Sequence, residues 1–346
     1  LPASEPFVHD LIRHLPGPSI VVSDAAPENL DRFPCDSLVA LGPRLDRVPE
    51  RARQRAATLW LSWLCHQREV GLIHAHHGYE VVRVAGAARR RRLPLVVSLH
   101  GHDAFGWVAS RPDAYRGILD RAAAVIVPSQ FLVSRAVALG APAERVHVIG
   151  SGIDTSRFEP SPVPLTPEVL FVGRFVEKKG LDVLADAWPA VAAAVPGARL
   201  RVLGYGPLEP LARRIDPDLV LAPDPAQVRD AIRRARVVVS PSRPATDDVA
   251  ETLLMVNLEA QASGRPVVTT DHGGIPEYVR DGETALVVPE ADAGALARAL
   301  VRVLSDDALS AALGHNGPAA VARFDVGVVA QRVMDLYESV GFEPSA

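Results

Sequence analysis

Short apolar, β-branched runs alternate with helical stretches along the chain, and this alternation restricts the fold more than any other feature of the sequence. Runs of this kind form strands that are buried on both faces of a sheet, and the helices between them allow successive strands to run parallel. The sequence therefore predicts an α/β fold with parallel sheets. The predicted strands are Ser19–Val22, Leu72–Ala75, Leu95–Leu99, Val125–Val127, Arg145–Val148, Val169–Val172, Arg199–Leu203, Val237–Val239 and Pro266–Thr269.

The length of the chain and one proline-rich segment predict two domains of similar size. The chain has 346 residues, which is beyond the size at which a single hydrophobic core usually divides. Four prolines fall within Phe158–Pro167, where they disfavour both a helix and a central strand. We therefore expect a first domain over residues 1–158, a linker over 159–167, a second domain over 168–326 and a final helical segment over 327–346.

The composition excludes several classes of protein. Hydrophobic residues make up 48% and charged residues 23%, as in ordinary globular proteins. No apolar run reaches the roughly 18 residues of a membrane span. Cys35 and Cys65 are the only cysteines, too few for a disulfide framework or a zinc quartet, and the formal net charge of −4 gives no indication of nucleic-acid binding. We expect a cytoplasmic protein.

Lys178 and Lys179 are the only lysines among 37 strong bases, and their position predicts an anion site. They follow a predicted strand and a turn that contains Gly173 and Arg174, just before a predicted helix. A helix N-terminus offers free backbone N–H groups to an anion. With the guanidinium fork of Arg174 and the point charge of Lys179, this pattern is typical of a diphosphate site. Two exposed bases on a loop are the alternative.

Two carboxylates, Glu251 and Glu259, follow the predicted strand Val237–Val239. We expect a helix to begin near Leu253, with Glu251 in the loop before it and Glu259 on its second turn. Carboxylates accept hydrogen bonds in pairs, which suits the hydroxyl groups of sugars. A charged helix cap and a solvated helix position would explain the same two residues.

Taken together, these segments resemble the family 4 retaining glycosyltransferases, which have the GT-B fold. The resemblance covers about residues 70–300, and its motifs occur in the family's order. It implies two Rossmann-like αβα domains whose parallel sheets face each other across a cleft, and a C-terminal helix that returns to the first domain. The segments that carry it are Leu99–Asp103, Val125–Phe131, Val148–Asp154, Gly173–Lys179, Gly204–Pro207, Glu251–Glu259 and Gln261–Glu277.

The resemblance also implies roles for individual residues. Arg174 and Lys179 would bind the donor diphosphate and stabilise the leaving group. Glu251 would contact the donor sugar, helped by backbone N–H groups of the next helix, and Glu259 would contact the ribose. The implied catalytic residues are His100, Arg174, Lys179 and Glu251; the implied donor-binding residues also include Gly173, Gly204, Gly206, Leu253, Leu254, Met255 and Glu259; and the implied acceptor residues are His77, Gly78, His102 and Asp103.

The implied reaction transfers a sugar from a UDP-, GDP- or ADP-sugar to a glycan, a lipid-linked acceptor or a small molecule. It proceeds with retention, without a metal or cofactor, and a donor phosphate oxygen takes the acceptor proton, so that Glu251 is not a nucleophile. The chain departs from the family pattern at Thr252, where glycine is usual, and in the first strand and glycine-rich turn, which are not seen. These departures leave open a phosphorylase of the same fold and a nucleotide-sugar-binding protein without activity.

Histidines at the ends of two predicted strands give a rival interpretation of a different class. His74, His76, His100 and His102 could form the metal site of a metal-dependent hydrolase, since alternate residues of a strand share a face. This cluster lacks a complete ligand set and does not account for the basic pair or the two glutamates. We interpret the Asp-Pro-Asp sequence at residues 216–218 as a turn rather than a metal motif.

Two arginine-rich stretches give a hypothesis about membranes. Arg89–Arg92 and a predicted helix over Arg47–Arg68 could form a basic patch that contacts the inner face of a membrane peripherally. A helix that packs through one face and is solvated on the other explains the same pattern. The apolar residues of this predicted helix are Leu59, Trp60, Leu61, Trp63 and Leu64.

Overall fold

The structure, a computed structural model, describes residues 6–23, 34–35, 37–41, 48–245 and 250–343. Its contacts divide the chain into two compact units: residues 1–152 with 326–346 form the first, and residues 153–325 form the second. All strand pairs in the described part of the chain are parallel. This confirms the predicted α/β class with parallel sheets.

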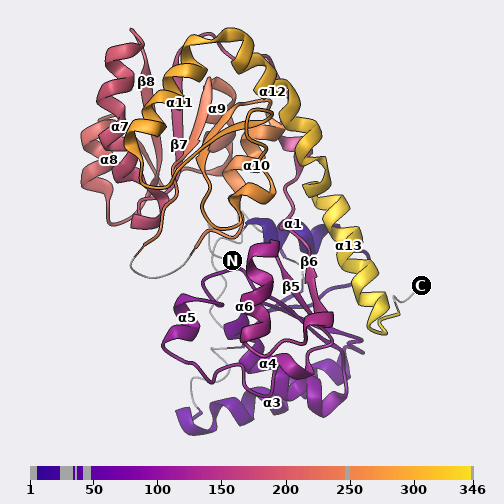
Figure 1. Cartoon of the computed structure of the whole chain (residues 1–346). Coiled ribbons are helices and arrows are strands. Elements are labelled where there is room, and N and C mark those ends of the chain that lie inside the picture. The colour runs from indigo at the N-terminus through magenta and orange to yellow at the C-terminus, as the bar shows by residue number, and fades with distance from the viewer. Residues whose placement is uncertain (1–5, 24–33, 36, 42–47, 246–249, 344–346) are drawn as a thin grey trace. The chain divides into compact units, whose positions relative to one another are not determined.

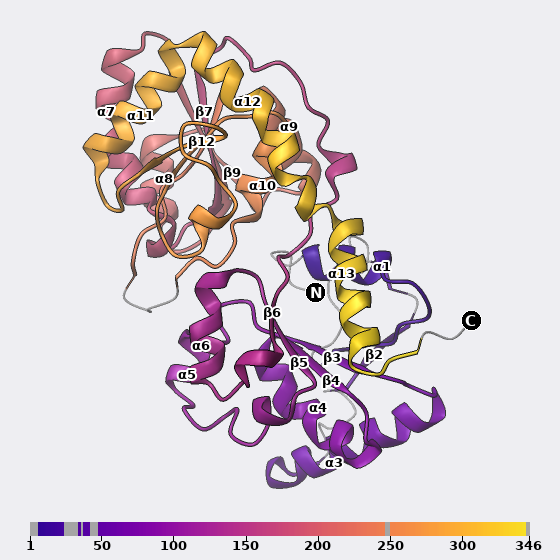
Figure 2. The ribbon, with the colours of Figure 1, turned by 45° about the vertical axis from the view of Figure 1, so that its right-hand side comes forward.

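The first unit is built on a four-stranded sheet with the order β3-β4-β5-β6, and β1 and β2 form a separate pair. One face of the larger sheet packs against α4 and α6, and the other face against α1 and α13 (Figures 1 and 2). The strands are β1 (Val21–Ser23), β2 (Leu38–Ala40), β3 (Ile73–His76), β4 (Leu95–Ser98), β5 (Ala124–Val127) and β6 (Val146–Val148). The helices are α1 (Pro6–His14), α3 (Glu50–Gln67), α4 (Gly78–Arg91), α5 (Gly106–Ala109), α6 (Val133–Ala138) and α13 (Val326–Ser339).

The second unit is built on a six-stranded sheet with the order β12-β11-β10-β7-β8-β9. Helices α7 and α11 cover one face of this sheet, and α9 and α10 cover the other (Figure 1). The strands are β7 (Glu168–Arg174), β8 (Arg199–Tyr205), β9 (Val220–Leu221), β10 (Val237–Ser240), β11 (Val267–Thr270) and β12 (Ala285–Val288). The helices are α7 (Leu181–Ala194), α8 (Glu209–Ile215), α9 (Pro225–Arg234), α10 (Met255–Ala262), α11 (Ala293–Ser305) and α12 (Asp307–Val321).

The order of the strands reverses between β7 and β10. From β7 the chain continues to β8 on one side, whereas β10 begins on the other side and leads to β11 and β12. In open parallel sheets, ligands bind at the carboxyl ends of the strands that flank such a reversal. We therefore expect a ligand site among the residues that follow β7 and β10.

The proline-rich segment is held against the second unit rather than serving as a free linker. Two arginines that are almost completely buried bind its carbonyl groups: Arg265 Nη1 donates to Ser161 O at 2.8 Å, and Arg236 Nη1 donates to Pro164 O at 3.3 Å. The division between the units falls before the predicted boundary at residue 158, because Ile153 pairs with Asp325 in the second unit. The predicted linker over residues 159–167 thus falls within the second unit.

Candidate active site

A short turn places both lysines beside the loop that follows β10. After β7, a single 3-10 turn, η5 (Glu177–Lys179), leads to Gly180, which has a φ of 65°. A Cβ atom at Gly180 would lie 1.7 Å from the carbonyl oxygen of Pro241, so only glycine fits there. Helix α7 begins at the next residue. The two lysines therefore stand directly before a helix N-terminus, as the sequence predicts.

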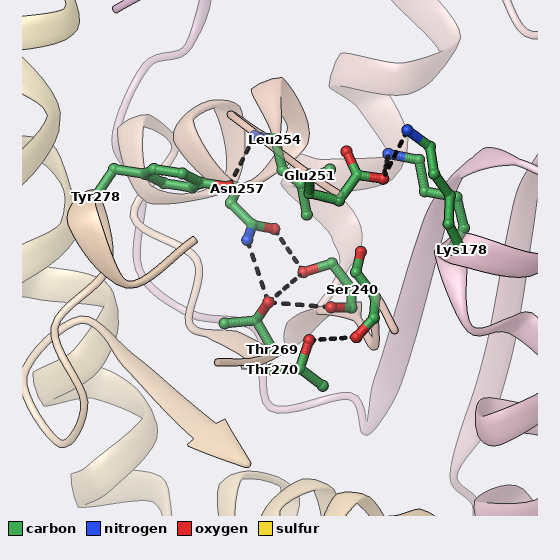
Figure 3. Close-up of polar contacts among 10 residues, drawn as sticks. Lys178, Ser240, Glu251, Leu254, Asn257, Thr269, Thr270 and Tyr278 are labelled. Carbon is green, nitrogen blue, oxygen red and sulfur yellow. Dashed lines mark hydrogen bonds and ion pairs between the residues drawn. The ribbon is translucent and has the colours of Figure 1, made fainter. Parts of the chain in front are cut away.

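Lys178 and Lys179 both contact the carboxylate of Glu251, and Figure 3 shows Lys178 beside Glu251. Lys179 Nζ lies 2.8 Å from Glu251 Oε1, and Lys178 Nζ lies 3.6 Å from the same atom. The side chains of Lys179, Lys178 and Glu251 are only 17%, 10% and 7% exposed. The alternative of two exposed surface bases is therefore wrong. The sequence reasoning assigned no role to Lys178, which is a second cation of the cluster.

The charges of this cluster shift the pKa values of its members. Burial alone would raise the pKa of Glu251, but Lys179 and Lys178 outweigh it, and the pKa lies below its usual value. Burial lowers the pKa of Lys179, and Glu251 opposes this effect while Lys178 and Arg174 add to it. Arg174 itself is exposed and forms no ion pair with any acid in the described part of the chain. The cluster thus holds more cations than the single carboxylate balances.

The main chain around Glu251 is fixed by the segment that follows β11. Gly274 N donates to Glu251 O at 2.8 Å, and a Cβ atom at Gly273 would lie 2.2 Å from that oxygen. Leu254 N donates to the Tyr278 hydroxyl at 2.7 Å (Figure 3), and α10 begins at the next residue. The Leu254 N–H predicted to serve the donor sugar is therefore already used inside the protein. The predicted helix start near Leu253 differs from the observed one by two residues.

A buried hydrogen-bond network connects β10, α10 and β11 beneath the cluster (Figure 3). Ser240 Oγ donates to Asn257 Oδ1 at 2.8 Å and lies 2.9 Å from Thr269 Oγ1. Thr270 Oγ1 donates to Ser242 O at 2.5 Å. Such a network fixes the start of α10, whose second turn carries the half-buried Glu259.

The predicted site glycines allow close packing of the strands themselves. A Cβ atom at Gly204 would lie 1.8 Å from Gly173 O, and one at Gly206 would lie 2.7 Å from Phe175 O. Gly173, by contrast, has room for a Cβ atom, with the Lys179 stem 3.8 Å away. The turn after β8 is thereby pressed against the turn after β7. This packing explains Gly204 and Gly206 without a ligand, so their proposed contact with a nucleotide stays a prediction.

Asp103, predicted as an acceptor residue, has its carboxylate occupied within the first unit. Its Oδ1 accepts from His100 N and Gly101 N, both at 2.9 Å, and its Oδ2 accepts from Gly78 N at 2.7 Å. The residue is completely buried. Asp103 therefore organises the segments after β3 and β4, and the structure does not support direct contact with an acceptor.

Several histidines of the first unit lie together and contact one another or other side chains of the same unit. His74 Nδ1 lies 2.6 Å from the Tyr337 hydroxyl, and its Nε2 lies 2.7 Å from Ser98 Oγ. His76 Nδ1 lies 3.4 Å from His100 Nε2, and the His77 and His100 ring centroids are 4.5 Å apart. His102, in contrast, is exposed. Burial lowers the pKa of His74 to about 3 and holds that of His76 and His100 well below the usual value.

This bonding argues against the rival metal-hydrolase interpretation. Both ring nitrogens of His74 have partners, so this histidine has no lone pair left for a metal. Among the residues that the structure describes, no three His, Cys, Asp or Glu side chains are grouped to hold a metal ion. In the predicted Asp216–Asp218 turn, Asp216 Oδ1 accepts from Asp218 N at 3.1 Å, and its Oδ2 accepts from Val202 N at 2.8 Å.

One cavity of the second unit lies away from the lysines. It measures about 660 Å³ and is lined from the beginning of β8, the end of α8 and the last turns of α9, with Arg199, Arg201 and Arg234 opposite Asp216 and Asp230. Because ligands of parallel sheets bind at the carboxyl ends of the strands, we place the site at Lys179 and Glu251 instead.

The fold and the cationic cluster define a two-domain α/β protein whose second unit is suited to an anionic ligand. The family model "Glycosyltransferase Family 4" matches residues 4–157, and the model "Glycosyl transferases group 1" matches residues 166–306. The chain belongs to this family of glycosyltransferases, as the sequence motifs predict.

Curated relatives and solved structures agree with this assignment. The putative colanic acid biosynthesis glycosyltransferase WcaL of Escherichia coli K12 is 36% identical over 54% of this chain and 48% of its own length. A GDP-mannose-dependent alpha-(1-6)-phosphatidylinositol monomannoside mannosyltransferase of Mycolicibacterium smegmatis is 34% identical over 68% of this chain and 66% of its own. The chain thus spans about half to two thirds of the length of these relatives.

The fold is also found in solved glycosyltransferase structures. HepE of Anabaena, solved in complex with UDP, aligns with a TM-score of 0.78 over 98% of this chain and 96% of its own, at 21% identity. A glycosyltransferase of Rickettsia africae aligns with the same TM-score over 96% and 93%, at 15% identity. These similarities confirm the predicted GT-B fold.

Proposed function

We propose that this protein transfers a sugar from a nucleotide diphosphate donor to an acceptor hydroxyl, with retention and without a bound metal. The observation that carries the proposal is the convergence of Lys178 and Lys179 on Glu251 at the reversal of strand order. Arg174 and the two lysines supply the positive charge that a metal ion would otherwise supply to a diphosphate.

The reaction assigns a task to each part of the cluster. The bond between the anomeric carbon and the diphosphate oxygen breaks, and Lys179 and Arg174 stabilise the charge that develops on the leaving group. The acceptor oxygen bonds to the anomeric carbon from the same face, and its proton passes to a phosphate oxygen of the donor. Glu251 holds hydroxyl groups of the donor sugar, and Glu259 holds the ribose.

In the first unit, the family pattern supports roles for four residues. We propose that His100 contacts the donor sugar and that His77, Gly78 and His102 contact the acceptor. Asp103 then acts indirectly, since it fixes the main chain of Gly78 and His100 through its three hydrogen bonds.

The names of the relatives support a choice of donor and acceptor for first tests. The name of the Mycolicibacterium relative includes GDP-mannose, an alpha-(1-6) linkage and phosphatidylinositol monomannoside, and the name of WcaL includes colanic acid biosynthesis. We propose a glycan or lipid-linked acceptor, with GDP-mannose as the first donor to test and UDP-sugars as the second.

Product analysis tests this proposal. The protein is incubated with each nucleotide sugar, an acceptor and EDTA, and the product is examined by NMR. We expect a product of retained, alpha configuration that forms in EDTA. An inverted product would contradict the mechanism, and loss of turnover in EDTA would contradict metal independence. Phosphate-dependent release of a sugar phosphate would indicate a phosphorylase, and binding without turnover would indicate a protein without activity.

We also infer a peripheral contact with an anionic membrane surface through α3 and the end of α4. Leu61 and Leu64 of α3 are buried, but Leu59 and Trp63, one turn apart, are each 56% exposed. Arg91 Nη2 donates to His66 Nδ1 at 3.2 Å, which brings the basic end of α4 beside this apolar pair. The exposed bases on these two elements and just after them are Arg53, Arg55, Arg68, Arg89, Arg90, Arg91 and Arg92.

This arrangement suits a headgroup surface, because Trp and Leu enter the interface while arginines bind anionic lipids. Within the described residues, no helix combines the length and the apolar character needed to cross a bilayer. We expect Trp63→Ser to reduce sedimentation with vesicles that contain phosphatidylglycerol. Val328→Ser, at an exposed apolar position of α13, is the matched control. Equal binding to neutral and anionic vesicles would contradict the inference.

A further inference from the structure

His272 and Glu290 form a polar pair at the same edge of the sheet as the lysine cluster. His272 lies two residues beyond the end of β11, and Glu290 lies two residues beyond the end of the neighbouring strand β12. His272 Nδ1 and Glu290 Oε1 are 2.6 Å apart. The sequence reasoning placed His272 within a family segment but gave it no role, and it did not consider Glu290.

The short contact fixes where the imidazole carries its proton. An ionised carboxylate can only accept, so His272 Nδ1 donates to Glu290, and in the neutral ring Nε2 is a bare acceptor. The His272 side chain is 6% exposed, and its Nε2 is buried without a hydrogen-bond partner in the described part of the chain. A buried acceptor without a donor is unfavourable, so such an atom indicates a missing partner.

The surroundings of His272 connect it to Glu251. The next two residues, Gly273 and Gly274, contact the carbonyl oxygen of Glu251. Glu251 Oε1 already has the ammonium groups of both lysines beside it, at 2.8 and 3.6 Å. His272 Nε2 is therefore a buried acceptor of this site that lacks a donor among the described residues.

Sugar hydroxyl groups can supply the donor that this acceptor requires. A hydroxyl group supplies one O–H donor, and a sugar presents several on neighbouring carbon atoms. The ammonium groups of Lys178 and Lys179 already lie beside Glu251, whereas His272 Nε2 has no cation that donates to it among the described residues. The chemistry therefore favours a neutral, hydroxyl-bearing group at His272.

We propose that His272 is a specificity-determining residue whose Nε2 accepts a hydrogen bond from a hydroxyl of the donor sugar. Glu290 is the positioning residue that keeps the proton on Nδ1 and so leaves Nε2 free to accept. This inference rests on the proposed function, because it requires that the second unit binds a nucleotide sugar.

The test compares binding of a nucleotide sugar with binding of its nucleoside diphosphate. Calorimetry of the full chain would use UDP, GDP and ADP, each alone and as UDP-glucose, GDP-mannose or ADP-glucose. We expect His272→Leu to weaken binding of the nucleotide sugar at least tenfold and to leave binding of the diphosphate within twofold. His315→Leu, an exposed histidine of α12, is the matched control.

Variants of Glu290 keep the test decisive if His272→Leu does not fold. Glu290 is about one third exposed, so its replacement leaves the core intact. We expect Glu290→Ala to weaken nucleotide-sugar binding several-fold and Glu290→Gln, which keeps an acceptor oxygen for Nδ1, to restore most of it. Nucleotide sugars that each lack one sugar hydroxyl identify the hydrogen-bond partner of His272. The wild type should bind the one that lacks this partner more weakly than the complete nucleotide sugar, whereas His272→Leu should bind the two equally.

The outcomes separate this inference from the proposed function. Equal loss of diphosphate and nucleotide-sugar binding in His272→Leu would show a structural role and overturn the inference, as would unchanged binding of both. Failure of the wild type to bind any diphosphate would overturn the proposed function, and the inference with it.

Discussion

The two units each contain a buried polar cluster at the carboxyl ends of parallel strands, but the clusters differ in how their hydrogen bonds are satisfied. In the first unit, the carboxylate of Asp103 accepts three backbone N–H groups, and both ring nitrogens of His74 have partners. In the second unit, His272 Nε2 has no hydrogen-bond partner among the residues that the structure describes, and Glu251 is held by the two lysines. A cluster whose hydrogen bonds are satisfied within the protein holds the main chain in place, whereas a buried polar atom without a partner can bind a ligand.

The two clusters also differ in charge: the first is neutral at its histidines, and the second is positive. The buried histidines of the first unit are held neutral, because burial lowers their pKa values. In the second unit, two lysines share one carboxylate, and the nearby Arg174 adds a third positive charge. An excess of positive charge in a partly buried site is stabilised when an anion binds. The comparison therefore supports the proposal that the second unit binds the donor diphosphate.

The largest expected effect is on turnover, when a cation of the second cluster is removed. Lys179→Ala and Arg174→Ala should each lower kcat/KM. The expected loss of transition-state stabilisation is about 2–4 kcal/mol, the range for a lost charge-stabilising donor. Steady-state kinetics with the donor identified by product analysis would measure this, with Arg302→Ala on the exposed face of α11 as the control. Unchanged turnover in either variant would refute the diphosphate role.

Removal of the Asp103 carboxylate should instead act on stability. Asp103→Ala leaves three buried N–H groups without an acceptor, and we expect the free energy of unfolding of the first unit to fall by roughly 3 kcal/mol or more. Urea unfolding would measure this loss. Asp113→Ala, at an exposed aspartate of the same unit, is the control. A loss below about 1 kcal/mol would show that the first cluster is not a scaffold.

Glu259→Ala should separate nucleotide binding from chemistry. Loss of a carboxylate that accepts from ribose hydroxyls should weaken nucleoside diphosphate binding about tenfold and change kcat less. Calorimetry with the diphosphate and kinetics at saturating donor would measure the two effects. A normal diphosphate affinity would count against the ribose role.

The smallest expected effect is the pH dependence of the first cluster. The pKa of His74 is about 3 in the folded state, against about 6.5 in the unfolded chain, so the unfolded state binds more protons between these values. Stability is therefore fully present above about pH 6.5 and is lost as the pH falls, on the order of 1 kcal/mol for His74 by about pH 6. Urea unfolding at pH 7 and at pH 6 should show a smaller loss of unfolding free energy in His74→Gln than in the wild type. Equal losses would contradict the lowered pKa of His74.

Much of the fold could be predicted from the sequence, because fully buried strands carry a strong signal. The nine predicted strands overlap β1, β3, β4, β5, β6, β7, β8, β10 and β11, whereas β2, β9 and β12 were not predicted. Strand β9 has two residues, too few for any pattern. Strand β12 (Ala285–Val288) is an apolar run next to Gly282, and this signal could have identified it.

The candidate site could be predicted only where one short segment carries the signal. The position of Lys179 beside a helix N-terminus follows from local sequence, and the structure places Glu251 against it. The other features of the site depend on contacts between residues far apart in the sequence. They are the hydrogen bond of Leu254 N to Tyr278, the burial of Lys178 and the hydrogen bonds of the Asp103 carboxylate. His272 and Glu290 come from different strand ends, and no local pattern joins them.

A thermal-shift panel with UDP, GDP, ADP and TDP, each with EDTA or with magnesium, tests the central claim most directly. A ligand at 100 times its Kd stabilises the folded state by about 2.7 kcal/mol. We predict that one diphosphate raises the melting temperature of the wild type in EDTA and that the same diphosphate has little effect on Lys179→Ala. The absence of a shift with all four, or an equal shift in Lys179→Ala, would contradict the assignment of the donor site to the lysine cluster.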